Sequence, residues 1–207
     1  MIVERAVAFT MSVSVSFTSR ASESISVALT FEFLGFPEDG PTLSLDHERF
    51  AYAGKFVMSS TGKAVARDDG EIVGAVAFSQ DHATPAQVRI RYVTVRDDRR
   101  GEGIGPRLLG GTATHLQERF ERVAIAVNNP IAYQACYRAG FVSTGRETGI
   151  AELLLVYAPG EATVEDYREG FRVFDRRHLP AVHRMVLETH AAGDPPELAP
   201  VPELTVT

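Results

Sequence analysis

The chain has 207 residues, a formal net charge of -6, 44% hydrophobic residues and 23% charged residues. These values are typical of a globular protein with one domain and extensions. The negative charge argues against a nucleic-acid partner, and no apolar run reaches the length of a membrane span, so no membrane partner is expected. The single cysteine, Cys136, excludes an intrachain disulfide and fits a reducing compartment such as the cytoplasm.

The first quarter of the chain predicts a leader, a strand and one short helix. Serine alternates with valine within residues 1–24, which predicts a flexible leader, because a secretory signal needs a continuous apolar stretch. Residues 25–36 predict a strand that ends where glycine and proline become frequent. Asp46 then predicts the N-cap of a short helix over residues 47–53.

A three-stranded meander is expected next, over residues 63–67, 71–79 and 87–96. The segment Asp68-Asp69-Gly70 joins the first two strands and is typical of a tight hairpin turn. On the third strand, Arg89 and Arg91 interrupt the simple apolar alternation.

A basic, glycine-rich loop follows this strand at Arg99-Arg100-Gly101-Glu102-Gly103-Ile104-Gly105, and a helical pattern begins there. The first N–H groups of a helix have no partner inside it, and its dipole adds positive charge, so a helix start favours phosphate. Glycine lets the backbone approach a ligand, and arginine supplies charge-assisted donors. The alternative is an ordinary solvated turn, because glycine patterns alone are weak evidence.

Two common nucleotide-binding loops fit this segment poorly. A P-loop would close with Gly-Lys-Ser or Gly-Lys-Thr, whereas Gly105 is followed by Pro106-Arg107. A Rossmann site needs a different glycine spacing and an acidic residue after the next strand, which here ends in Val127-Asn128-Asn129. A nucleotide-binding domain is therefore the weakest interpretation.

Helix, strand and helix follow the loop. Apolar residues at helical spacing predict a helix from Ile104 to Phe120, and residues 121–127 predict a fully buried strand. Asn129 and Pro130 predict the start of a second helix over residues 131–139. Further strands are expected at residues 142–145 and 151–157.

The arrangement of residues 63–157 resembles the GNAT superfamily of acyl-CoA-dependent N-acetyltransferases. The family signature Arg/Gln-x-x-Gly-x-Gly/Ala is carried by residues 100–105, Asn-x-x-Ala by residues 129–132, and a closing Gly-Phe by residues 140–141. The resemblance implies an α/β (α+β) fold with a mixed, mostly antiparallel central sheet, flanked by helices and splayed at its centre.

The resemblance also implies acetyl-CoA as co-substrate and a small-molecule or peptide amine as acceptor. The acetyl group would pass to a primary amine by direct attack in a ternary complex. The alternative is a non-catalytic acyl-CoA-binding or regulatory module with the same fold.

In this family the strand before the loop pairs with the pantetheine arm, and the loop binds phosphate. The residues that the resemblance assigns to acetyl-CoA are Val93, Thr94, Val95, Arg99, Arg100, Gly101, Glu102, Gly103, Ile104, Gly105, Asn128 and Asn129. A purely capping role explains Asn129 equally well.

Catalytic residues are marked less clearly. A positioned acid can protonate the departing CoA thiolate, and the family usually places a tyrosine where this chain has Cys136. Tyr137, one position later, is the predicted acid, with Cys136 as the alternative. Glu147 is the predicted general base, and Glu152 is a second candidate; the alternative is that each is a surface or turn carboxylate.

The chain changes character after residue 158. Two predicted helices, over residues 165–174 and 178–190, form an extension (residues 159–192) that either packs on the domain of residues 25–158 or makes a homodimer contact. Prolines in residues 193–207 predict a disordered tail. The histidines of the extension lack the spacing of a helical metal site, so no metal is predicted.

Overall fold

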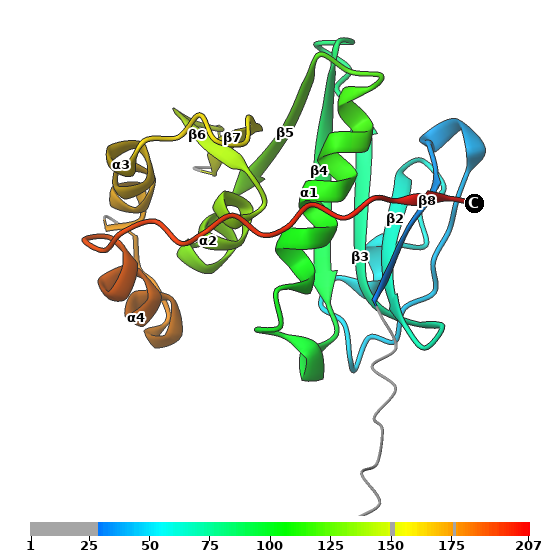
Figure 1. Cartoon of the computed structure of the whole chain (residues 1–207), viewed down its shortest axis with the longest axis horizontal. Coiled ribbons are helices and arrows are strands. Elements are labelled where there is room, and N and C mark those ends of the chain that lie inside the picture. Colours follow the sequence, from blue (N-terminus) through cyan, green and yellow to red (C-terminus); the bar gives the residue numbers. More distant parts are fainter. Residues whose placement is uncertain (1–28, 150–151, 176) are drawn as a thin grey trace, which may run out of the picture.

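The computed structural model describes residues 29–149, 152–175 and 177–207, so the predicted leader lies outside the described residues. The described strands form one eight-stranded sheet in the order β6-β7-β5-β4-β3-β2-β1-β8 (Figure 1). Among the described strands, only β4 with β5 and β1 with β8 pair in parallel, which confirms the mixed, mostly antiparallel sheet. The bounds are β1 Thr30–Gly35, β2 Gly62–Asp68, β3 Glu71–Gln80, β4 Gln87–Val95, β5 Arg122–Val127, β6 Phe141–Glu147, β7 Leu153–Tyr157 and β8 Thr205–Val206.

The described residues form four α-helices: α1 Ile104–Gln117, α2 Pro130–Arg138, α3 Val164–Asp175 and α4 Ala181–His190. Helix α1 lies over β2, β3 and β4, whereas α3 and α4 pack on α2, and α3 also contacts β6. Tyr167, Phe171 and Phe174 of α3 are fully buried in the same core as α1 and α2. The C-terminal extension therefore packs on the domain. None of the described helices is long and apolar enough to cross a membrane.

The hairpin between β2 and β3 forms where it was predicted. Asp68 pairs with Glu71, which leaves Asp69 and Gly70 as the two turn residues, with φ of 48° and 79°. A two-residue turn with positive φ at both positions matches the twist of the flanking strands, and Asp-Gly adopts it readily.

The predicted short helix over residues 47–53 is wrong. The Asp46 side chain accepts a hydrogen bond from the Glu48 backbone N–H at 2.9 Å, as an N-cap would. The chain makes turns instead, and Tyr52 adopts φ of 60°, which stops right-handed helix propagation before the 3-10 turn Ala53–Lys55. Leu43 and Phe56 of this segment are buried on the side of the sheet away from α1.

The predicted disordered tail, residues 193–207, is also wrong. The tail runs across α1, as Figure 1 shows in red, and ends in β8 beside β1. The Ala199 N–H donates to the Arg138 carbonyl at 2.7 Å. A Cβ atom on Gly111 would lie 2.9 Å from the Pro202 carbonyl oxygen, so this helical glycine admits the tail. Prolines suit such an extended crossing because it makes little use of backbone N–H groups.

Candidate active site

The sheet divides between β4 and β5. These strands pair only from Gln87 to Ile90 and from Arg122 to Ile125, and Figure 1 shows β5 leaning away from β4 beyond that point. A cavity of about 650 Å³ occupies the division, and we call it the cleft. Its walls come from the ends of β4 and β5, from α2, and from the turn around Tyr52. The expectation of a sheet splayed at its centre is thereby confirmed.

A β-bulge marks the point where β4 leaves β5. Ala77 of β3 pairs with Tyr92 and Phe78 pairs with Ile90, so Arg91 is an extra residue in β4. Val93 packs on the core beneath α1, whereas Tyr92 packs on the opposite side of the sheet. The bulge therefore explains why arginine interrupts the apolar alternation of this strand.

The exposed edge of β4 offers polar groups to a ligand. Beyond Ile90 the strand has no pairing with β5, so its backbone groups on that side face the cleft. Thr94 is 4% exposed and lines the cleft, and its hydroxyl has no hydrogen-bond partner within the described part of the chain. Buried polar atoms are rarely left unpaired, so this wall fits an extended ligand with amide groups.

The glycine-rich loop lies at the open end of the cleft. Gly101 and Gly103 have φ of 89° and 77°, and Gly103 is the N-cap of α1. A side chain on either glycine would be strained, and the first N–H groups of α1 have no partner inside the helix. Arg100 and Gly105 line the cleft, and Arg100 also pairs with Asp97 at 2.5 Å. This end of the cleft is therefore suited to an anion.

Arg99 serves the loop rather than the cleft. Its guanidinium donates to Glu102 at 2.8 Å and also pairs with Asp68 in the β2–β3 hairpin. The hydrogen bond to Glu102 is the main cause of the raised pKa of Arg99, and the hydrogen bond to Asp68 is the next. Arg99, Gly101, Glu102, Gly103 and Ile104 are absent from the residues lining the cleft. Of these, Arg99 and Glu102 brace the loop through their ion pair.

Asn129 is the N-cap of α2, as predicted. Its side-chain oxygen accepts from the Ala132 N–H at 2.9 Å, and its amide group donates to the Asn128 side chain at 2.9 Å. Asn128 and Asn129 both line the cleft, together with Val93, Thr94 and Val95. These five residues of the predicted acetyl-CoA site therefore come together.

Cys136 and Tyr137 face in different directions. Cys136 lines the cleft and is 2% exposed, and burial raises the pKa of its thiol to about 12. Tyr137 does not line the cleft, and its ring lies 4.5 Å from that of Tyr167 in α3. Successive residues of a regular helix point about 100° apart, so the one-residue offset seen in the sequence persists in space.

The predicted base, Glu147, lies outside the cleft. It pairs with Arg177 at 3.0 Å, and its side chain is 48% exposed. Glu152 and His183 do line the cleft, the first just before β7 and the second on α4. Sequence reasoning named Glu152 as the second candidate and gave His183 no role, because only the packing of α4 brings that histidine to the cleft.

Arg138 was also missed. Its terminal Nη2 atom lies 3.8 Å from the position that a Cβ of Gly103 would take, and it has no acidic partner among the described residues. The side chain is half-buried at the end of α2. No local pattern marks it, because its proximity to the loop depends on how α2 packs against α1.

A sheet divided between two parallel strands, with a glycine-rich helix start at the open end, is the architecture of an acyltransferase fold. The family model described as "Acetyltransferase (GNAT) family" matches residues 28–141, and the chain belongs to this family. A Bacillus subtilis acetyltransferase in complex with CoA is similar in fold, with a TM-score of 0.51 and 12% identity over 63% of this chain and 99% of that chain.

A GNAT family acetyltransferase from Elizabethkingia anophelis with acetyl-CoA bound gives a TM-score of 0.48 and 14% identity, over 63% of this chain and 97% of that chain. A GNAT family protein from Desulfovibrio desulfuricans, described as a putative acetyltransferase, gives a TM-score of 0.47 and 14% identity, over 63% of this chain and 97% of that chain. A search of the curated proteins found no match.

Proposed function

We propose that the protein transfers the acetyl group of acetyl-CoA to a primary amine. The observation that carries this proposal is the cleft between β4 and β5, which combines unpaired strand backbone along one wall with the glycine-rich start of α1 at its end. The CoA complex of the similar Bacillus subtilis protein supports the choice of ligand.

Each part of the cleft matches a part of the cofactor. The N–H groups at the start of α1, with Arg100, would bind the pyrophosphate, because a helix start and arginine both favour phosphate oxygens. Arg138 would add a second cation beside the loop. The backbone of residues 93–95 and the Asn129 side chain would bind the amide groups of the pantetheine arm.

The reaction needs a neutral amine and a stabilised oxyanion. The amine attacks the thioester carbon, a C–N bond forms, the C–S bond breaks, and CoA leaves as a thiolate. Backbone N–H groups of β4 at the bulge would stabilise the oxyanion. Glu152 would accept the proton that the amine loses, directly or through water.

The departing thiolate receives little help from Cys136. A thiol with a pKa of about 12 is a weaker acid than an ordinary thiol at about 8.5, so proton transfer from it to CoA would be uphill. Tyr137 would need to turn from Tyr167 to reach the cleft. We therefore propose that the thiolate leaves without an obligatory protein acid, and that Tyr137→Phe retains most activity.

Calorimetric titration tests the cofactor site. Acetyl-CoA and desulfo-CoA should bind the protein, whereas NAD and ATP should not. The double variant Arg100→Ala, Gly103→Val should lose this binding. Gly145→Val is a matched control, because Gly145 also has positive φ, at 67°, with open space around it, yet lies outside the cleft. Failure of both CoA compounds to bind the unaltered protein would contradict the proposal.

A non-catalytic acyl-CoA-binding or regulatory module is the second candidate. The observation that favours it is the turning of Tyr137 away from the cleft. Both candidates bind acetyl-CoA, and only the enzyme releases CoA when an amine is added.

We also propose a cytoplasmic location, from the single cysteine, and a homodimer contact at the exposed Val182 and Met185 of α4.

A further inference from the structure

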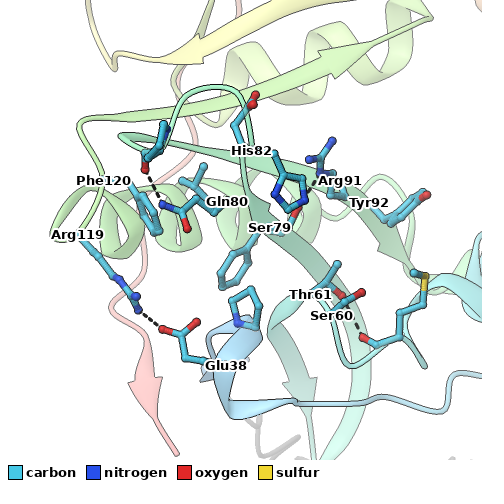
Figure 2. Close-up of a pocket in the computed structure, with 16 residues that line it drawn as sticks. Glu38, Ser60, Thr61, Ser79, Gln80, His82, Arg91, Tyr92, Arg119 and Phe120 are labelled. Atoms are coloured by element: carbon cyan, nitrogen blue, oxygen red, sulfur yellow. Dashed lines mark hydrogen bonds and ion pairs between the residues drawn. The ribbon is translucent and has the colours of Figure 1, made fainter.

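A second cavity, also of about 650 Å³, shares Arg91 and Tyr92 with the cleft. We call it the side pocket. It lies among the β3–β4 turn, the segment around Pro37 and the end of α1, and Figure 2 shows its lining. Its apolar lining comes from Met58, which is 46% exposed, and from Pro37 and Tyr92, whereas Phe78 and Phe120 lie buried beneath. This lining can therefore contact an apolar group.

The carboxylates of the side pocket are already paired. Glu38 pairs with Arg119 at 2.5 Å, as drawn in Figure 2. Asp81 accepts from the Ala83 N–H at 2.9 Å and pairs with Arg89, and these contacts lower the pKa of its carboxyl group. Neither carboxylate is left to attract a cationic ligand.

Arg91 is the uncompensated charge. Its Nε donates to the Ser79 hydroxyl at 2.8 Å, which holds the guanidinium over the strand. Its side chain is exposed, and no carboxylate among the described residues pairs with it. The bulge in β4 places this charge on the wall that the two cavities share. An anionic group of a ligand would therefore bind at the boundary between them.

We propose that the acceptor is an α-amino acid with an apolar side chain. The carboxylate would bind Arg91, and the side chain would lie against Met58 and Pro37 in the side pocket. The α-carbon carries both the carboxylate and the amine, so binding at Arg91 brings the amine to the cleft. The amine then takes the acetyl group from the thioester, and the products are an N-acetylamino acid and CoA.

This inference rests on the proposed transferase function and goes further by naming the acceptor. Arg91 would repel polyamines and aminoglycosides, whose charges are all positive. An amine without a carboxylate would leave the guanidinium unpaired. The expected preference is therefore for the free amino acid over its amide, and for a large apolar side chain over glycine.

The first experiment measures CoA release from acetyl-CoA with L-phenylalanine, L-methionine, glycine, L-phenylalaninamide, phenethylamine and spermidine as acceptors. L-Phenylalanine and L-methionine should give the highest kcat/KM. The amide and phenethylamine should fall by roughly 10- to 100-fold, the range expected when a hydrogen bond to a charged group is lost. Equal use of the amide and the acid would overturn the proposal.

The second experiment compares Arg91→Met with Arg146→Met, since Arg146 is exposed and lines neither cavity. Arg91→Met should remove the preference for acid over amide, mainly through the KM of the amino acid. Arg146→Met should leave this preference unchanged. A preference that survives Arg91→Met would overturn the proposal. Binding of acetyl-CoA without acetylation of any amino acid would overturn it too, whereas no binding of acetyl-CoA would overturn the proposed function itself.

Discussion

The two halves of the sheet are held together in different ways. Strands β1 to β4 form an antiparallel meander whose pairing extends along most of each strand, and Ala64, Val76 and Phe78 at its centre are fully buried. Strands β5, β7 and β6 pair over shorter lengths and depend on α2 and α3 for cover. The first half therefore combines long strand pairing with cover from α1, whereas the second combines shorter pairing with cover from α2 and α3.

Among the described residues, the halves are joined by the four residue pairs of β4 with β5, by α1, which contacts β5 and α2, and by the C-terminal tail. The tail leaves the helical extension, crosses α1 and pairs with β1, so it connects the outer parts of both halves. The binding cleft lies along the same division. Residues 193–207 therefore add a connection across this division to the one that α1 makes.

The halves also divide the chemistry. The first half supplies Arg91, Thr94 and the loop, whereas the second supplies Glu152 and His183.

Glu152→Gln should lower kcat by about 10²- to 10⁴-fold, the usual contribution of a general base, and leave acetyl-CoA affinity unchanged. Steady-state kinetics with L-phenylalanine measures this effect. Glu147→Gln is the matched control, because Glu147 is paired with Arg177 outside the cleft, and it should change kcat little. If Glu147→Gln lowered kcat and Glu152→Gln did not, the general base would be Glu147 instead.

Packing of the helical extension on the second half can be broken at Gly170. A Cβ atom there would lie 2.1 Å from the Tyr133 hydroxyl oxygen, which itself donates to the Tyr167 carbonyl at 3.0 Å. Gly170→Ala should therefore lower the free energy of unfolding by about 3 kcal/mol, the upper part of the range for an overpacked core. Urea denaturation measures this change. Glu169→Ala, on the exposed neighbouring residue, should stay within about 0.5 kcal/mol. Equal stability of the two variants would show that the extension is not part of the core.

The sequence predicts best what is local. The Asp69-Gly70 turn, the Asn129 cap and the glycine-rich start of α1 each depend on a few adjacent residues, and all three form as expected. The family signature adds the order of strands and helices around them. Such features can be predicted from the sequence because backbone conformation and capping are decided within one turn of chain.

What the sequence misses is decided by distant contacts. The bulge at Arg91 appears only when β3 and β4 are paired. Arg99 looks like a phosphate ligand until Asp68, from a hairpin far away in the chain, occupies its guanidinium. The tail looks disordered by composition, because composition does not record that Gly111 leaves room for Pro202.

The contact between the tail and α1 can be tested by whether one substitution raises or lowers the free energy of unfolding. Gly111→Ala in a helix normally stabilises by about 1 kcal/mol. In the full chain the new Cβ would meet Pro202, so the substitution should destabilise or be neutral. In a chain that ends at Ala199, the same substitution should stabilise. Thermal unfolding of the four proteins measures the coupling, and the same sign in both backgrounds would mean that the tail does not press on α1.

The last prediction concerns the pH dependence of stability and Lys63, which anchors the segment covering the first half. Its buried ammonium donates to the Pro41, Met58 and Thr61 carbonyls at 2.6–2.9 Å, and burial lowers its pKa to about 8. An unfolded lysine titrates near 10.4, so between about pH 8 and 10 the unfolded state holds more protons than the folded one. Stability should therefore rise with pH in that window, by at most about 1.4 kcal/mol per pH unit. Subtracting the curve of Lys63→Met removes the contribution of other titrating groups. A difference that is flat from pH 8 to 10 would mean that the carbonyl oxygens stabilise the ammonium enough to offset its desolvation, and that the segment over the first half is held by a permanent charge.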